Sequence, residues 1–280
     1  MSLTPRLPRT WAASPPLGGL TALERMHIGL VRATLRRGRL DQAIRLLQRS
    51  IGQSWIRAAT ARLRHVHGLE RLPPWNPSES LILVANHRSF FDLYATTAEL
   101  VARGLPQRIL FPVRSNFFYD HPMGPVVNAA MSFFAMYPPI FRDRSRAALN
   151  VASLDELADR LRSGGFFVGM HPEGTRKKDG DPYTFLPAQG GVGRVIWRAR
   201  VPVIPVFVNG LGNNLVEQVV AGVTGSGNPI HIVFGAPIEF GALLARPPSP
   251  KSYRLVAERC LDAIGELGQE ERTLRAGRRH

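Results

Sequence analysis

Short apolar runs that alternate with stretches of helical periodicity constrain the fold of this chain more than any other feature of its sequence. From residue 80 onward, six runs have the length of buried strands, and six helical stretches separate or follow them. This alternation predicts an α/β fold with a central, mostly buried mixed sheet flanked by helices. The predicted strands cover 81–85, 108–113, 136–141, 166–170, 203–208 and 230–234, and the predicted helices cover 91–102, 122–134, 146–162, 191–199, 213–221 and 252–267.

The N-terminal residues show a different pattern, in which apolar residues recur at steps of three and four and arginines fill the polar positions. Thr21 and Glu24 form the pattern of a helix-capping box. The apolar series from Leu40 to Val66 predicts one amphipathic helix, or two helices broken near Gly52. Two interpretations stay open, and both can hold on different faces. The apolar stripe packs on the α/β core, or it lies on an anionic membrane surface, where each arginine adds about 1 kcal/mol of attraction.

These patterns divide the chain into three predicted segments. Residues 1–19 are rich in Pro, Ser, Arg and Gly, and we expect a mobile arm there. Residues 20–72 are expected to form the basic amphipathic helices, and residues 73–280 the α/β domain. No apolar run reaches the roughly 18 to 20 residues that span a bilayer, and no secretory signal is recognisable. We therefore expect a cytoplasmic protein, peripheral on the inner face of the cell membrane.

The chain is strongly basic, with 36 Lys and Arg against 21 Asp and Glu and a net charge of +15. Codon bias explains why nearly all of these cations are arginine, but it does not explain the charge itself. A basic surface indicates anionic partners such as phosphate headgroups, an acidic carrier protein or nucleic acid. A nucleic-acid-binding module is a competing interpretation, but we expect no nucleic-acid partner because no zinc-finger or RNP-type motif is present and aromatics are not interleaved with the basic stretches. The single Cys260 excludes a disulfide framework within the chain.

Polar residues with chemical potential follow several of the predicted strands. His87 and Asp92 are five residues apart across a predicted strand-to-helix turn. Such a turn places a carboxylate on one imidazole nitrogen and leaves the other nitrogen as a base. A second predicted strand runs into Pro172-Glu173-Gly174-Thr175-Arg176, where Gly174 permits close backbone approach and Arg176 can bind an anion through two hydrogen bonds. Taken singly, each motif also fits a helix cap or a surface turn.

Four such blocks in this order resemble the glycerolipid acyltransferases of the lysophosphatidic-acid acyltransferase type. Asn86-His87 with Asp92 matches the NHxxxxD block, and residues 172–176 match PEGTR. Residues 141–144 match a block that usually ends in Phe-Ile-Asp-Arg, and residues 201–206 match the VPVIPV block. The resemblance covers about residues 68–240. His171 stands where the family commonly has Phe, and Arg142 replaces an apolar residue; we expect neither to touch the reacting groups.

The resemblance implies direct acyl transfer without an acyl-enzyme. In that mechanism His87, held by Asp92, is the general base. Arg114, Arg144 and Arg176 are expected to bind the phosphate of the acceptor, with Glu173, Gly174 and Thr175 in the same binding group. Glu173 is expected to orient the arginines or an acceptor hydroxyl. The resemblance implies no metal and no bound cofactor, and the acyl donor, acyl-CoA or acyl-carrier protein, is a co-substrate.

The predicted function is transfer of a fatty acyl group from an acyl thioester to the hydroxyl of a lysolipid, with 1-acylglycerol-3-phosphate as the default acceptor. The same chemistry on a lyso-ornithine lipid, another lysophospholipid or a specialised metabolite is an alternative. A non-catalytic membrane-binding relative is a third possibility, which the presence of His87, Asp92, Glu173 and Arg176 disfavours. The expected partners are the thioester donor, the lysolipid and an anionic membrane surface.

Overall fold

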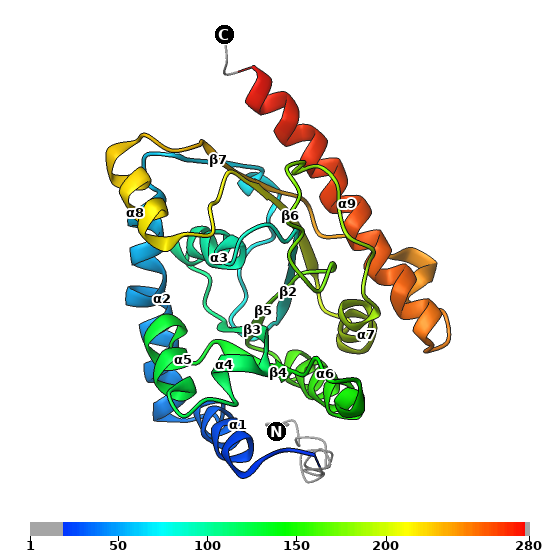
Figure 1. The fold of residues 1–280 in the computed structure, drawn as a ribbon. Helices are drawn as coiled ribbons and strands as arrows, with labels where there is room; N and C mark the ends of the chain where they lie inside the picture. The colour runs from blue at the N-terminus through cyan, green and yellow to red at the C-terminus, as the bar shows by residue number, and fades with distance from the viewer. Residues whose placement is uncertain (1–18, 278–280) are drawn as a thin grey trace, which may run out of the picture.

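A seven-stranded sheet lies at the centre of the structure, and helices cover both of its faces (Figure 1). The structure is a computed structural model that describes residues 19–277, so the arm predicted for residues 1–19 lies almost entirely outside the described residues. The order of the strands across the sheet is β1-β7-β6-β2-β5-β3-β4. In chain order they are β1 (Arg64–His67), β2 (Leu81–Ala85), β3 (Arg108–Arg114), β4 (Met136–Ile140), β5 (Phe166–Met170), β6 (Val203–Asn209) and β7 (Ile230–Phe234).

The sheet is mixed, as predicted, because one pair of neighbouring strands is antiparallel. β6, β2, β5, β3 and β4 pair in parallel along one side of the sheet. β7 runs antiparallel to β6, and β1 pairs in parallel with β7. The carboxyl ends of five adjacent strands therefore meet at one edge, which is where ligands bind in open α/β sheets.

Two groups of helices enclose this sheet. On one face lie α2 (Arg39–Thr60), α3 (Asp92–Ala102) and α8 (Leu215–Thr224), and on the other lie α6 (Ala147–Arg162), α7 (Gly190–Ala199) and α9 (Pro250–Ala276) (Figure 1). The remaining α-helices are α1 (Ala22–Thr34), α4 (Ser115–Phe118) and α5 (Gly124–Ser132), and short 3-10 turns occur at Leu69–Arg71, Arg144–Arg146 and Gly241–Leu243.

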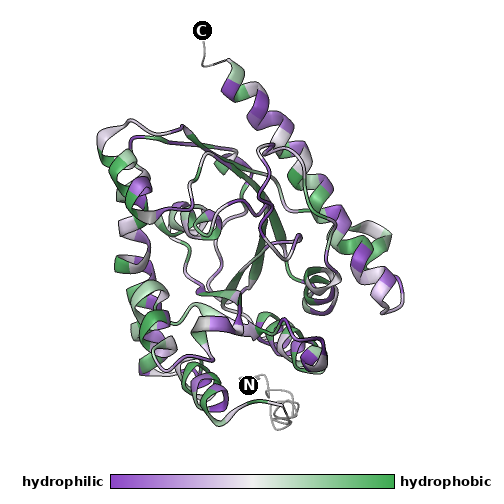
Figure 2. Cartoon of the chain, in the orientation of Figure 1, coloured by the Kyte–Doolittle hydropathy of each residue, from purple (hydrophilic) through white to green (hydrophobic). Residues whose placement is uncertain are grey.

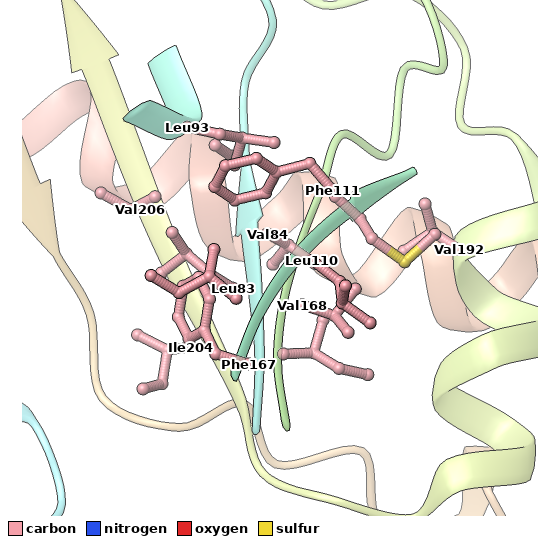
Figure 3. Close-up of a cluster of buried hydrophobic side chains, with 14 of the residues drawn as sticks. Leu83, Val84, Leu93, Leu110, Phe111, Phe167, Val168, Val192, Ile204 and Val206 are labelled. Atoms are coloured by element: carbon pink, nitrogen blue, oxygen red, sulfur yellow. The ribbon is translucent and has the colours of Figure 1, made fainter. Parts of the chain in front are cut away.

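Because both faces are covered, the central strands are apolar along their whole length rather than at alternate positions. Every residue of β2, β5 and β7 is buried. Figure 3 shows side chains of β2, β3, β5 and β6 packed against one another, with Leu93 of α3 and Val192 of α7 reaching the cluster from different sides. This packing fixes the strands that lead into the candidate site.

The structure decides between the two alternatives for the N-terminal helical series. α2 continues through Gly52 without a break, and this glycine is buried, so that a Cβ there would lie 2.9 Å from the ring of Phe133. The helical series predicted up to Val66 ends earlier, because Arg64–His67 form β1 at the edge of the sheet. The capping box of Thr21 and Glu24 is confirmed at the start of α1.

Pro205 lies in β6, an interior strand between β2 and β7, whereas proline in a sheet normally occurs at an edge, a strand start or a bulge. The proline is tolerated because its carbonyl oxygen accepts a hydrogen bond from the N–H of Gly235, at an N···O distance of 2.9 Å. The backbone nitrogen of Pro205, which carries no hydrogen, lies on the same side and faces residue 235. This residue is one position beyond the end of β7, and the pairing of β7 with β6 starts at Phe234. One hydrogen bond at the end of the ladder is lost, and the ladder interior is intact.

Two helical glycines provide a matched test of how tightly the helices pack. Gly193 lies where α7 meets α9, and a methyl group there would overlap the carbonyl oxygen of Tyr253, whereas a methyl at Gly29 in α1 would meet nothing within 4 Å. Alanine favours a helix over glycine by about 1 kcal/mol. We expect Gly29→Ala to be neutral or stabilising by up to about 1 kcal/mol, and Gly193→Ala to be destabilising by more than about 2 kcal/mol because the helices must separate.

The measurement is the free energy of unfolding by urea for both variants and the parent. Equal stability of the two variants would contradict the close α7–α9 packing.

Candidate active site

Four adjacent strands deliver the predicted site residues to one edge of the sheet. β2 pairs with β5 so that Val84 lies opposite Met170, and β3 pairs with β4 so that Arg114 lies opposite Ile140. Polar residues follow these strands at the same edge, directly or after one residue. His87 follows β2, and the PEGTR block follows β5. The structure thus brings together blocks that are far apart in the sequence.

The turn after β2 is built around the carboxylate of Asp92, which is only 1% exposed at the start of α3. Its Oδ2 accepts the backbone N–H groups of Arg88 and Ser89, each at 2.7 Å, and lies 3.4 Å from Nδ1 of His87. Because an ionised carboxylate can only accept hydrogen bonds, Nδ1 of His87 carries the proton and Nε2 retains its lone pair. This is the tautomer that a general base requires.

Asn86, the first residue of the same block, anchors the turn to the neighbouring strand. Its side-chain amide donates to the carbonyl oxygen of Val208 and accepts from the N–H of Val208, both at 2.8 Å. The end of β2 is therefore tied to β6 by a reciprocal pair of hydrogen bonds.

Glu173 contacts backbone amides rather than the arginines that it was expected to orient. Its carboxylate is buried and accepts two backbone N–H groups, with Oε1 2.8 Å from the nitrogen of His87 and Oε2 2.8 Å from the nitrogen of Leu186. Both oxygens are therefore occupied by backbone amides rather than by an arginine. Burial raises the pKa of Glu173, whereas these amides lower it. Glu173 therefore ties the turn after β2 to the 172–186 loop.

His171 lies directly against His87, contrary to the expectation that it would not touch the reacting groups. The two imidazole rings are stacked with centroids 3.7 Å apart and an interplanar angle of 9°. Nδ1 of His171 lies 3.0 Å from the carbonyl oxygen of Ala85, to which it donates its proton. Sequence reasoning missed this contact, although β5 ends beside β2 and its next residue is therefore a neighbour of His87.

Burial dominates the electrostatics of this cluster. Desolvation and then the charge of Arg176 lower the pKa of His87 from 6.5 to about 4. Desolvation lowers the pKa of His171 to about 3 and raises the pKa of Asp92 from 3.8 to about 6. At neutral pH both imidazoles are thus uncharged, and the carboxylate is ionised.

A cavity of about 550 Å³ opens beside His87. Its lining is largely apolar, and its polar lining groups include His87, His171 and three arginines. The apolar lining includes Phe90, Leu93, Tyr94, Phe111, Val113, Phe118, Met136, Ile140, Leu154, Met170 and Val192. A cavity of this size and character fits an apolar chain whose polar end lies at His87.

Three of the six residues expected to bind the acceptor, Arg114, Gly174 and Arg176, line this cavity. Arg114 donates to the hydroxyl of Thr175, and Arg176 donates to Oδ1 of Asn213 at 2.6 Å.

Arg144 is exposed in the turn before α6 and does not line the cavity, whereas Arg142, two residues earlier, does. The sequence comparison had set Arg142 aside because it departs from the family pattern. Its place two residues after the end of β4, at the same edge as His87, was the available signal.

His87, Asp92 and His171 each present a potential metal ligand, and the three donor atoms lie within 4.8 Å of one another. The lone pair of an imidazole nitrogen lies in the plane of the ring, so two parallel stacked rings direct their lone pairs side by side rather than toward one ion. The stacked rings of His87 and His171 therefore do not form a converging set of ligands.

A family model described as Acyltransferase matches residues 63–209, which is more than half of the chain and includes all four blocks. The chain belongs to the acyltransferase family. It is 29% identical over 125 residues to the human 1-acyl-sn-glycerol-3-phosphate acyltransferase beta, a match that covers 45% of this chain and 40% of the human protein. It is 32% identical over 175 residues to a 1-acyl-sn-glycerol-3-phosphate acyltransferase of Chlamydomonas reinhardtii, covering 62% of this chain and 47% of the algal protein.

These matches span less than half of the length of either relative. Among solved structures, the chain resembles the 1-acyl-sn-glycerophosphate acyltransferase PlsC from Thermotoga maritima. The TM-score is 0.51 at 21% sequence identity, and the superposition covers 86% of this chain and 88% of PlsC. This likeness confirms the predicted α/β fold with N-terminal helices. The chain is thus a distant homologue of 1-acyl-sn-glycerol-3-phosphate acyltransferases.

The role of Glu173 can be tested by Glu173→Gln. The amide keeps the size of the side chain but replaces one acceptor oxygen by a donor, which leaves one buried backbone N–H without a partner at a cost of about 1 to 3 kcal/mol. We expect a loss of stability in urea unfolding and faster hydrogen exchange at the amides of His87 and Leu186. The control is Glu217→Gln on the exposed side of α8, which should leave both unchanged. Slow exchange in the Glu173 variant would show that these amides have other acceptors.

Proposed function

We propose that this acyltransferase moves a fatty acyl group from an acyl thioester to the free hydroxyl of a lysolipid, with 1-acylglycerol-3-phosphate as the acceptor. One observation carries the proposal: the His87–Asp92 pair lies beside an apolar cavity that also presents three arginines. A base, an apolar compartment and a cluster of cations are the three features that an acyl chain and a phosphorylated alcohol require. The relatives named above, which act on this acceptor, support the same substrate class.

In the proposed reaction, Nε2 of His87 removes the proton of the acceptor hydroxyl as its oxygen attacks the thioester carbonyl. A C–O bond forms, the C–S bond breaks, and the proton passes from the imidazolium to the departing thiolate. Asp92 stabilises the imidazolium and preserves the tautomer of His87. The products are the diacylated lipid and the free thiol of coenzyme A or of an acyl-carrier protein. The cavity residues hold the acyl chain, and Arg114, Arg142 and Arg176 bind the phosphate.

The first test is His87→Ala with His121→Ala as the matched control, because His121 is exposed and does not line the cavity. Loss of a general base lowers the rate by about 10² to 10⁴. We expect such a loss in thiol release from acyl-CoA with 1-acylglycerol-3-phosphate, and no loss for the control.

Burial lowers the pKa of His87 to about 4, and protonation below that pKa removes the base, so kcat/KM should reach its half-maximum on the acid side below pH 6.5. More than a tenth of the parental rate in His87→Ala would remove His87 from the mechanism. A panel of other lysolipids in the same assay identifies the acceptor.

A second test separates Arg142 from Arg144. Arg142 lines the cavity and Arg144 does not, although both are exposed and follow β4. A charge-assisted hydrogen bond to phosphate contributes about 1.5 to 3 kcal/mol. Arg142→Gln should therefore raise the KM of the acceptor by about 10- to 100-fold with little change in the KM of the donor. Arg144→Gln should resemble the parent. The reverse outcome would restore the role that the sequence comparison assigned to Arg144.

We also propose that the acyltransferase reaches its lipid substrate on an anionic membrane surface. No helix in residues 19–277 is long and apolar enough to cross a membrane. The inner faces of α1 and α2 pack on the core, through residues such as Ile28, Val31 and Ile56. Their outer faces, with those of α5 and α8, still expose large apolar residues, and these helices show hydrophobic positions in Figure 2. The exposed set includes Met26, Leu30, Leu40, Leu46, Ile51, Val126, Val216, Val220 and Val223.

The membrane proposal predicts a loss of lipid binding in Arg36→Gln/Arg39→Gln/Arg49→Gln. These arginines are exposed in or next to α1 and α2, unlike Arg32 and Arg45, which form ion pairs with Glu156 and Asp41. We expect the triple variant to bind vesicles of anionic lipid about 10- to 100-fold less tightly, and salt to weaken binding of the parent.

The control removes the same charge from the opposite side, with Arg246→Gln/Lys251→Gln/Arg254→Gln, and is measured by co-sedimentation across a salt series. If both triple variants bind like the parent, α1 and α2 serve only to cover the core.

A further inference from the structure

The hydrogen bonds around His87 fix its main chain more firmly than its ring. The backbone N–H of His87 is held by Glu173 at 2.8 Å. The ring has a weaker restraint, because Nδ1 lies 3.4 Å from Oδ2 of Asp92, well beyond the usual 2.9 to 3.0 Å of an N–H···O bond. That oxygen already accepts two backbone amides at 2.7 Å each. Rotation of the imidazole about its Cβ–Cγ bond is therefore poorly opposed by the carboxylate alone.

The ring of His171 supplies the missing restraint. It lies 3.7 Å from the ring of His87 and is parallel to it within 9°. It is itself held by the hydrogen bond from its Nδ1 to the carbonyl oxygen of Ala85, at the end of the neighbouring strand. Any rotation of the His87 ring out of its plane would drive it into this fixed surface.

We propose that His171 is a positioning residue whose flat ring holds the plane of the His87 imidazole, so that Nε2 stays aimed at the acceptor hydroxyl. The inference rests on the proposed role of His87 as general base. A catalytic group must stay within about 0.5 Å and 10 to 20° of its productive geometry, and a misplacement of about 1 Å can lower the rate by about 100-fold. Stacking on His171 restrains the rotation of the His87 ring about its Cβ–Cγ bond, which the long contact to Asp92 leaves free.

His171 acts through its face rather than through a proton of its own. Its Nδ1–H is committed to the carbonyl oxygen of Ala85. Burial keeps its pKa near 3, and a positive charge on both stacked rings would be strongly repulsive, so His171 is neutral while His87 works. The geometry therefore predicts that a flat ring without nitrogen can replace His171, and that a polar side chain without a ring cannot.

Two variants separate the ring from the hydrogen bond. His171→Phe keeps a flat ring and loses the donor, whereas His171→Asn keeps a donor and loses the ring. We expect His171→Asn to lower kcat by about 10- to 100-fold with the KM of both substrates nearly unchanged. We expect His171→Phe to recover most of that loss. Thermal unfolding of each variant shows whether the fold is retained.

A readout independent of turnover is the NMR spectrum of ¹⁵N-labelled histidine, which reports the tautomer of His87. The Nδ1–H form should dominate in the parent and in His171→Phe, and the two tautomers should mix in His171→Asn. In the background of His87→Ala, the Asn substitution should cause no further loss. Parental kcat in a folded His171→Asn variant, or an equal loss in both variants, would overturn the inference. Full activity of His87→Ala would instead overturn the proposed function.

Discussion

The parallel pairing of β2 with β5 is the constraint on which the proposed chemistry depends. Because Val84 lies opposite Met170, the residues that follow the two strands leave the sheet side by side. His87 and His171 can then stack, and Glu173 can accept the backbone N–H of His87. A slip of one residue in this register would turn the side chains that follow one strand away from those of the other. The buried, apolar character of both strands fixes the register, so packing in the core determines geometry in the site.

Two buried carboxylates then fix the conformation of the loops at this edge of the sheet. Asp92 and Glu173 are each about 1% exposed, and each accepts two backbone amides. A buried carboxylate without such partners would be strongly unfavourable. Here the carboxylates instead organise two loops, and one of them also faces the imidazole. Two buried carboxylates therefore stabilise the site, although the chain has a net charge of +15. The arginines lie mainly at the surface and in the cavity.

Most of the fold and the core of the candidate site could be predicted from the sequence, for physical reasons that also explain the errors. Buried strands such as Phe166–Met170 are apolar at every position, so their ends are visible in the sequence. β1 cannot be recognised in this way, because Arg64–His67 is largely polar and half-buried. It lies at the sheet edge and joins the sheet through backbone pairing with β7. The positions of His171 beside His87 and of Arg142 at the cavity were missed because they depend on neighbours across strands. Pattern matching to relatives treated both as departures, and only the sheet order shows what they contact.

The proposed membrane surface and the turn that holds His87 are connected through the segment that leads into α8. Ser89 donates to the carbonyl oxygen of Gly212 at 2.6 Å, and Asn213 accepts from Arg176 at 2.6 Å. Asn214 then caps α8, whose exposed valines begin two residues later. The apolar face of α8 therefore starts within a few residues of groups that touch both the His87 turn and a cavity arginine. A lysolipid has its phosphate next to the hydroxyl that is acylated and its chain in the bilayer. An enzyme for such a molecule needs its base, its cations and its lipid-facing surface close together, and this segment brings them close.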